Sequence, residues 1–293
     1  MLPTCYVLSD VDAQKYFKIW DLLDDYVNQE IALTSIFKNY PLNVDVPEVL
    51  LKCSVLNSFY SAGILNIDLL KVAEVIVNCD IDNDLQSGNW NVVYRILKAL
   101  NNAGIHNYYS FVSKYCNWHN QEKFPIYDSY VDNVVWHLKQ NNCINSFKHR
   151  KDLGDYTTFG NALFEIYKNF SLTSAEILRK GEVDVNYKII DRYLWLLGKY
   201  HYADSDTSSV KDIAKAMKVV ESNTYKAHYE NYVITRSISG TIKVSENGSV
   251  ATNTKDALRK ISQTIGFKFD HNWNTRQFGK KIIEFINLKY YLV

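Results

Sequence analysis

The fold of this chain is decided by one segment, Tyr109-Ser-Phe-Val-Ser-Lys-Tyr-Cys-Asn-Trp-His-Asn-Gln-Glu-Lys-Phe-Pro-Ile-Tyr-Asp-Ser-Tyr-Val131. Its aromatic-rich first half predicts a helix, and Pro125 ends that helix because the residue before a proline is held extended. A second helix is predicted to begin at Asp128, and its apolar positions fall on one face: Val131, Val134, Val135 and Leu138. The pattern therefore presents one acidic residue at a helix start, directly after a proline-fixed extended segment.

Asp128 has two interpretations on this pattern. Aspartate is a preferred N-cap residue, so Asp128 can simply satisfy the free amides of the helix that follows. Alternatively, its carboxylate lies desolvated at the floor of an aromatic cleft, where it would have a chemical role. The surrounding residues lead to the second interpretation through a family resemblance.

The segment resembles the helix-hairpin-helix DNA glycosylases. In that family a hairpin of two helices is followed by a short apolar extended run that ends in Val/Ile-x-Asp-Thr/Ser-x-Val. The run Pro125-Ile-Tyr-Asp-Ser-Tyr-Val131 fits this pattern and places Asp128 at the catalytic aspartate of the family. The resemblance covers about residues 45–200 and implies a mainly α fold, with a two-lobed helix-hairpin-helix glycosylase-like body and a cleft between the lobes.

The resemblance implies that a nucleotide is flipped out of the duplex into a pocket of stacking side chains. A fixed carboxylate then stabilises the positive charge that builds on the sugar as the base departs, so no metal or organic cofactor is needed. The candidate base-pocket residues are Asn57, Tyr60, Trp118, His119 and Tyr127. For each of these, ordinary core packing, local capping or, for His119, a solvated loop position is an alternative.

Two departures from the family pattern narrow the expected chemistry. The turn Ala103–Tyr109 keeps one glycine where the family usually has Leu-Pro-Gly-Val/Ile-Gly, which weakens a backbone cradle for a DNA phosphate. Family members with lyase activity carry a nucleophilic lysine roughly 18–20 residues before the aspartate. Tyr108 to Ser110 occupy that spacing here, so we expect a monofunctional enzyme that leaves an abasic site. Tyr108, Tyr109 and Lys114 are then assigned to contacts with the DNA backbone.

Composition predicts a packed protein in a reducing compartment. The 293 residues are 47% apolar, and the five cysteines contain no Cys-x-x-Cys pair, which excludes a zinc ribbon. We expect a cytoplasmic protein without a membrane segment, because no leader and no apolar run of membrane-spanning length is visible. Net charge is only +1, but residues 211–293 carry 14 Lys and Arg against 7 Asp and Glu. This basic C-terminal part is consistent with contacts to phosphates.

The chain is expected to divide into three parts: a helical glycosylase-like body (1–200), a linker with a connecting helix (201–231) and a small α+β basic module (232–293). In the module, period-2 alternation over 232–251 with Asn247-Gly248 predicts a β-hairpin. Helices are predicted over 253–265 and 276–288. The second of these carries Arg276, Lys280 and Lys281 as candidate DNA contacts, with a solvated or protein-docking face as the alternative.

Helical periodicity also predicts the elements of the body. One or two helices are expected over 9–39, a polar turn over 80–88 and a basic loop over 145–160. The other predicted helices are 47–60, 67–79, 89–101, 161–170, 185–197 and 210–229. In the helix 185–197, Trp195 is interpreted as core, and Arg192 is expected to pair elsewhere or to reach the cleft.

The leading hypothesis is therefore a DNA glycosylase acting on double-stranded DNA that carries modified bases. The composition is similar to that of bacterial glycosylases that remove hypermodified cytosines from phage DNA, so a role in antiviral defence is expected. The first alternative is a non-catalytic helix-hairpin-helix protein that binds DNA or a partner. The second is a glycosidase that acts on a nucleotide or a tRNA.

Overall fold

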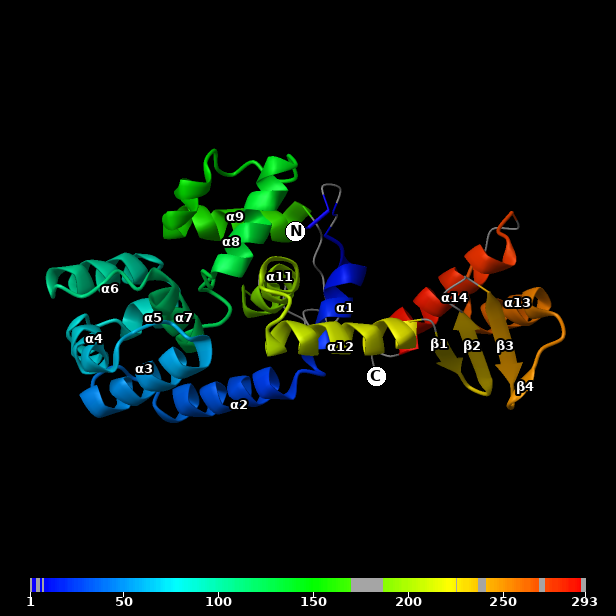
Figure 1. The fold of residues 1–293 in the computed structure, drawn as a ribbon, viewed down its shortest axis with the longest axis horizontal. Coiled ribbons are helices and arrows are strands. Elements are labelled where there is room, and N and C mark those ends of the chain that lie inside the picture. The colour runs from blue at the N-terminus through cyan, green and yellow to red at the C-terminus, as the bar shows by residue number, and fades with distance from the viewer. Residues whose placement is uncertain are drawn as a thin grey trace. The chain divides into compact units, whose positions relative to one another are not determined.

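The computed structural model describes residues 2–3, 6, 8–169, 187–224, 226–236, 241–268 and 272–290. It divides into two compact units, Met1–Ile213 and Ala214–Val293 (Figure 1). The protein is mainly helical with a small C-terminal antiparallel sheet, as predicted. Cys5 lies outside the described residues, as do Phe170 and Val185 at the edges of two predicted helices. No described helix is long and apolar enough to cross a membrane.

The helices of the first unit follow the predicted periodicity closely. They are α1 (Asp10–Trp20), α2 (Asp24–Asn39), α3 (Val46–Tyr60), α4 (Asn66–Asn78), α5 (Asp82–Ser87), α6 (Asn91–Asn102), α7 (Tyr109–His119), α8 (Ser129–Gln140), the 3₁₀ helix η1 (Arg150–Gly154), α9 (Tyr156–Asn169) and α11 (Tyr187–Tyr202). α12 (Ser208–Thr224) runs across the boundary between the units.

Helices α2 to α7 pack around one apolar core. Leu33, Cys53, Ile76 and Ile96 lie in it and are fully or almost fully buried, as expected for one stripe of each amphipathic helix. α6 and α7 pack against each other and are joined by the turn at 103–108. Gly104 in this turn has a φ of 71°, a conformation that glycine adopts without steric cost. The chain therefore forms a helical hairpin immediately before the Asp128 segment.

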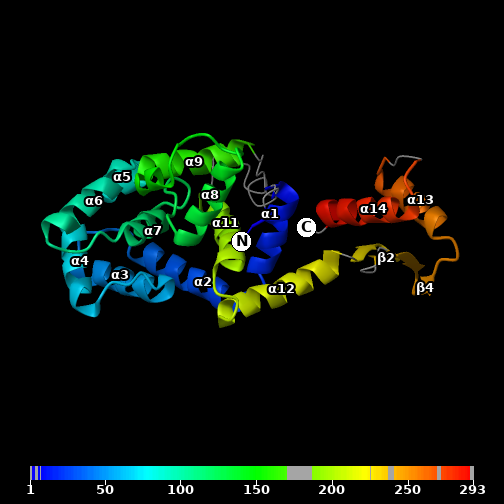
Figure 2. The same cartoon turned by 45° about the horizontal axis from the view of Figure 1, so that its top comes forward.

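A second group of helices surrounds α11. α11 packs on α8 and α1, and both views show it between them (Figures 1 and 2). At the crossing with α8, a Cβ added to Gly198 would lie 2.4 Å from the carbonyl oxygen of Tyr130. Glycine at this position allows α11 to reach the first turn of α8, next to Asp128.

Between α7 and α8 the chain makes a turn at 121–123 and then runs through 124–128 without helix or turn to Asp128, whose backbone is extended, as Pro125 predicts. The side-chain amide of Asn117 donates to the carbonyl of Phe124 at 2.6 Å, and the hydroxyl of Tyr156 donates to the carbonyl of Pro125 at 2.7 Å. These bonds satisfy buried backbone carbonyls that no strand partner satisfies. They also fix the path of the chain into Asp128.

Two predictions for the first unit were wrong. The expected polar turn over 80–88 contains the helix α5, which buries Leu85, and α9 begins within the expected loop, at the buried Tyr156. Each segment offers only a few large apolar residues among polar neighbours, for example Ile81 and Leu85 in the first. Such a short apolar pattern does not predict a helix by itself. Burial in the tertiary structure stabilises these helices, and the sequence does not show that burial.

The second unit is a sheet covered by helices. β1 (Lys226–Tyr229), β2 (Tyr232–Arg236), β3 (Ile242–Glu246) and β4 (Ser249–Val250) form one antiparallel sheet in sequence order, and α13 (Thr254–Ile265) and α14 (Thr275–Tyr290) pack on it. The predicted hairpin is confirmed, with Asn247 and Gly248 both at positive φ between β3 and β4. The predicted helix 210–229 was wrong at its end, where β1 pairs with β2 and buries Ala227.

We predict that Gly198→Ala destabilises the protein by roughly 1–3 kcal/mol, because a methyl group at this position overlaps the backbone of α8. Urea unfolding followed by circular dichroism measures the effect. Gly154→Ala is the matched control, since a Cβ there meets no atom within 4 Å. Equal unfolding free energies for the two variants would show that α11 does not cross α8 so closely.

Candidate functional site

Asp128 is the N-cap of α8 and also an ion-pair partner. One carboxylate oxygen accepts from the amide of Tyr130 at 2.9 Å, and the other lies 3.3 Å from Nζ of Lys114. Its side chain is 16% exposed. The capping interpretation therefore holds for one oxygen, while the second oxygen is fixed by a buried cation.

The side chain of Lys114 lies in the interior, on the face of α7 that meets the extended segment. The residue is 3% exposed, and its ammonium donates to Oγ of Ser110 at 2.6 Å and to the carbonyl of Tyr127 at 3.2 Å. Together with Asp128, these acceptors match the three donors of an ammonium. The assignment of Lys114 to a DNA phosphate is corrected, since a cation enclosed in this way is not presented on the surface.

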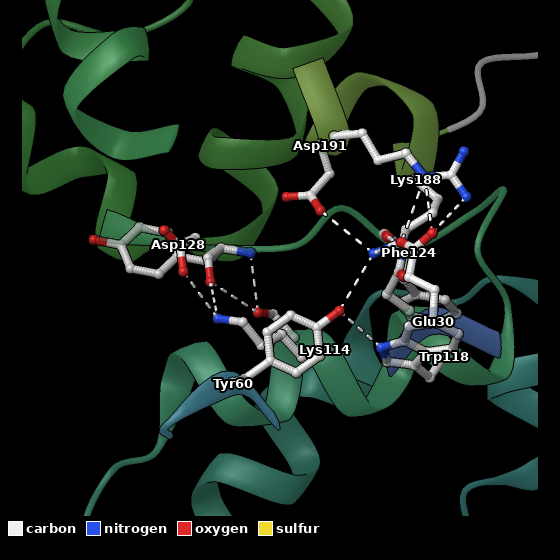
Figure 3. A network of polar contacts seen from close by, with 12 residues as sticks. Glu30, Tyr60, Lys114, Trp118, Phe124, Asp128, Lys188 and Asp191 are labelled. Atoms are coloured by element: carbon white, nitrogen blue, oxygen red, sulfur yellow. Dashed lines mark hydrogen bonds and ion pairs between the residues drawn. The ribbon is translucent and has the colours of Figure 1, made fainter. Parts of the chain in front are cut away.

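Tyr60, at the end of α3, connects Lys114 to a second buried lysine (Figure 3). Nζ of Lys114 lies 5.3 Å from the centroid of the Tyr60 ring. The Tyr60 hydroxyl accepts from Nε1 of Trp118 at 3.1 Å and from Nζ of Lys188 at 3.3 Å. Two of the predicted pocket residues, Tyr60 and Trp118, are thus brought to the Asp128 region, but Trp118 is almost fully buried.

Lys188 of α11 is the centre of a buried ionic cluster. Its ammonium lies 2.9 Å from Glu30 of α2 and 3.6 Å from Asp191, one turn further along α11. Arg192 pairs with the other oxygen of Glu30 at 2.7 Å. Five segments of the chain therefore meet at this junction, namely α2, α3, α7, α11 and the start of α8 (Figure 3).

The protonation of this cluster is set by burial and by its charges. Burial disfavours ionisation of Glu30, but Lys188 and Arg192 outweigh it and hold the pKa of Glu30 below its usual value. Burial raises the pKa of Asp191 to about 6, although Lys188 acts against it. Among the described residues, Oδ1 of Asp191 is buried and has no hydrogen-bond partner.

His119 belongs to a different cluster. Its ring lies against Phe37 and Tyr115, and Nε2 is 3.5 Å from Nζ of Lys52. Lys52 is fully buried and donates to two carbonyls and to Oδ1 of Asn43, which closes the end of α2. Burial next to Lys52 lowers the pKa of His119 to about 3. The assignment of His119 to the base pocket is corrected, because it is a neutral packing residue in this cluster.

Asn57 also has a structural role. Its side-chain amide bonds both the amide and the carbonyl of Ile64, each at 2.9 Å, and so closes the turn between α3 and α4. Its assignment to the base pocket is corrected, because the nitrogen and the oxygen of its side-chain amide are both hydrogen-bonded to the backbone of Ile64.

The candidate tyrosines near Asp128 are partly buried. The rings of Tyr109 and Tyr127 pack at a centroid distance of 4.5 Å, and Tyr127 also contacts Phe159. Tyr108 is the N-cap of α7 and packs edge-to-face on His106. Tyr127 and Tyr109 therefore form a wall beside the extended segment, while Tyr108 lies at the hairpin turn.

The basic candidates of the second unit lie along α14. Lys280 and Lys281 are both about half exposed and both lie near Glu284, at 3.7 and 3.0 Å. Arg276 lines a surface pocket together with Thr241, Ile242, Thr252, Asn253, Thr254, Lys255 and Thr275. In the described part of the chain, no group of three or more His, Cys, Asp or Glu side chains is placed to hold a metal ion.

The sequence interpretation missed Glu30 and Lys188, and it took the Asp191 region as core. A signal was present, because Lys188 and Asp191 are charged residues spaced i and i+3, with the apolar Ile189 and Ile190 between them. Their partner Glu30 lies in another helix, far away in sequence, so the sequence alone did not indicate the ionic cluster.

We predict that Asp191→Asn becomes more stable relative to the wild type as pH rises. Asp191 has a native pKa raised from 3.8 to about 6. The unfolded chain therefore releases this proton at lower pH than the native protein, and the wild type loses stability between these values. Above pH 6 this loss lowers the unfolding free energy of the wild type by an amount on the order of 1–3 kcal/mol. The neutral amide of Asp191→Asn does not titrate, so the variant shows no such loss. Urea unfolding of both proteins from about pH 4 to 7 measures it; a difference that is constant with pH would refute a raised pKa.

Comparison with known proteins identifies relatives but no function. The family model HI_0787_N, described as an N-terminal domain, matches residues 12–123, which run from within α1 past the end of α7 and stop before Asp128. An uncharacterized protein of Haemophilus influenzae is 33% identical over 193 residues, which span 65% of this chain and 81% of the relative. No solved structure gives a significant match. Because the similarity covers 81% of the relative at 33% identity, the chain belongs to the same family as this Haemophilus influenzae protein.

Proposed function

We propose that this protein is a monofunctional DNA glycosylase with a two-lobed helix-hairpin-helix body. It flips a modified base out of double-stranded DNA and hydrolyses the N-glycosidic bond with the carboxylate of Asp128, leaving an abasic site. The observation that carries the proposal is the geometry of Asp128, which is partly exposed at the end of an extended segment and held by Lys114 and the amide of Tyr130.

This geometry suits the stabilisation of a cationic sugar. As the base departs, positive charge develops at the anomeric carbon, and a fixed anion lowers the energy of that state without reorganising. Lys114 and the Tyr130 amide hold the carboxylate in one orientation before substrate arrives. The same carboxylate can orient the attacking water.

The aromatic side chains around Asp128 are proposed to receive the flipped base. Tyr60 lies between the two buried lysines, and Tyr127 with Tyr109 forms the wall beside the extended segment. Stacking on such rings tolerates different bases, which suits an enzyme for modified DNA. Trp118 supports Tyr60 from the core through its hydrogen bond to the hydroxyl.

Contacts to the DNA backbone are proposed to come from the turn between α6 and α7 and from basic residues of the second unit. A Cβ at Gly104 would meet no atom within 4 Å, so the turn between α6 and α7 is open to a phosphate. In the second unit, Arg276 and the exposed Lys280 and Lys281 supply positive charge. We propose that the substrate is phage DNA with hypermodified cytosine and that the enzyme acts in the cytoplasm.

The second candidate function is a non-catalytic protein of the same fold that binds DNA or a partner. One observation favours it, namely that Asp128 caps α8 and would be retained for that reason alone. Measurements on Asp128 variants separate this function from catalysis.

We predict that Asp128→Asn keeps its fold and its affinity for DNA but releases no base. Asparagine caps a helix as well as aspartate does, so the start of α8 is retained, although Lys114 loses its counterion and the variant is less stable than the wild type. The loss of the negative charge removes the stabilisation of the sugar cation. The assay incubates the protein with duplexes that contain cytosine, hydroxymethylcytosine or glucosylated hydroxymethylcytosine, and alkaline cleavage then reveals abasic sites. We expect a loss of at least about 100-fold.

Asp45→Asn is the matched control for this experiment. Asp45 caps α3 through the amide of Glu48, so the same chemical change is made at another helix start. The control is expected to release base at the wild-type rate. If Asp128→Asn did the same, the catalytic assignment would be wrong.

We further predict that no covalent adduct with DNA forms in the presence of sodium borohydride. All donors of the Lys114 ammonium are engaged by Ser110, Tyr127 and Asp128, so water and not the amine is expected to attack the sugar. Gel electrophoresis of the borohydride reaction detects a trapped Schiff base. An adduct that disappears in Lys114→Met would instead identify Lys114 as a nucleophile with lyase activity.

A further inference from the structure

Among the residues that the structure describes, one carboxylate oxygen of Asp191 has no hydrogen-bond partner. Oδ2 lies 3.6 Å from Nζ of Lys188, whereas Oδ1 is buried and has no hydrogen-bond partner among the described residues. The side chain is only 8% exposed. Buried polar atoms are nearly always paired, so an exception in the interior is a candidate for a functional role.

The position of Asp191 connects this oxygen to the proposed reaction centre. α11 packs on α8, whose first turn follows Asp128. Figure 3 shows the residues that lie between the two carboxyl groups, and a chain of contacts joins them. It runs from Asp128 to Lys114 at 3.3 Å, from Lys114 to the Tyr60 ring at 5.3 Å, from the Tyr60 hydroxyl to Lys188 at 3.3 Å and from Lys188 to Asp191 at 3.6 Å.

We propose that Asp191 is the general acid of this site and donates a proton from Oδ1 to the departing base. The proposal rests on the glycosylase function proposed above. The C–N bond breaks with its electron pair on the base, and the base nitrogen, or an atom conjugated to it, takes the proton of the Asp191 carboxyl. Water then adds to the anomeric carbon, and its proton returns to the Asp191 carboxylate. Asp128 remains ionised throughout and stabilises the sugar.

The surroundings of the two carboxyl groups assign these different roles. Both oxygens of Asp128 have donors, namely Lys114 and the Tyr130 amide, which suits an anion. Asp191 is buried, has its nearest cation at 3.6 Å and has one oxygen without a partner among the described residues, which suits a neutral acid that can donate. Two carboxyl groups in such different environments are the usual arrangement for a division between charge stabilisation and acid catalysis.

The groups that act on Asp191 come from every element at the junction. Burial raises its pKa to about 6; the charges of Lys188 and Lys114 lower this pKa, and those of Asp128 and Glu30 raise it. Tyr60 contacts Lys188 from α3, and Arg192 pairs with Glu30. The protonated form of Asp191 is therefore available near neutral pH, where a proton donor is most effective.

The experiment measures single-turnover base release by the full chain from about pH 5 to 8. We expect the wild-type rate to fall as pH rises above about 6, because the acid is then deprotonated. At pH 5, Asp191→Asn is expected to be slower by roughly 100- to 10,000-fold, and its rate no longer falls across this range. Asp45→Asn, the cap control, is expected to retain the wild-type profile.

Two further measurements separate acid catalysis from a structural role. In Lys188→Met the loss of the cation raises the pKa of Asp191, so the fall in rate moves to higher pH. Among substrates that the wild type processes, bases that depart readily as anions need less protonation, so the defect of Asp191→Asn is smaller on them. A defect equal on all substrates, with an unchanged pH profile, would mean that Asp191 only supports the structure.

The outcomes for the two proposals are distinct. If Asp128→Asn is inactive and Asp191→Asn keeps the rate and pH profile of the wild type, only the assignment of Asp191 fails. If Asp128→Asn retains the wild-type rate, the proposed mechanism fails. If the wild type releases no base from any of the duplexes, the proposed function is overturned, and the role of Asp191 with it.

Discussion

The helix junction depends on the contacts of the Lys188 ammonium with the acceptors around it. A buried cation is tolerated only with anions and hydrogen-bond acceptors in place, and here they come from Glu30 of α2, Asp191 of α11 and Tyr60 of α3. These partners fix how α11 lies against α2 and α3. Because α11 also crosses the first turn of α8 at Gly198, the same interaction positions the helix that begins after Asp128.

Burial of a lysine is not sufficient to make a site, as a comparison within this protein shows. Lys52 is fully buried, but its acceptors are two carbonyls at the end of α2 and the amide of Asn43, so it closes a helix end. Lys114 is similarly buried, yet one of its acceptors is a carboxylate that is 16% exposed. Only the second arrangement holds a negative charge that is partly exposed to solvent. Lys52 and Lys114 therefore differ in their hydrogen-bond and ion-pair partners and not in how deeply they are buried.

Much of the fold follows from local patterns, whereas the site does so only in part. Helical periodicity, the extended segment at Pro125 and the turn at Asn247-Gly248 were predicted because each depends on neighbouring residues. The position of Asp128 at the start of α8 was predicted for the same reason. The cluster at Lys188 was not, because the Arg192–Glu30 pair within it joins residues that are 162 positions apart. The burial of Lys114 was likewise missed, since spacing along the chain does not show that α7 turns this side chain towards the extended segment.

The capping role of Asp128 and the catalytic role proposed for it are compatible, because they make different demands on one side chain. A cap needs only one side-chain oxygen, and serine, threonine or asparagine would serve as well for about the same free energy. Lys114, which is only 3% exposed, restricts the position further, because a neutral cap would leave the charge of this lysine without a counterion. The ion pair therefore requires an acid at this position, and the helix start requires that the acid be short. Aspartate meets both conditions, so a carboxylate is fixed at the protein surface in a single orientation, which is the arrangement that a developing sugar cation needs.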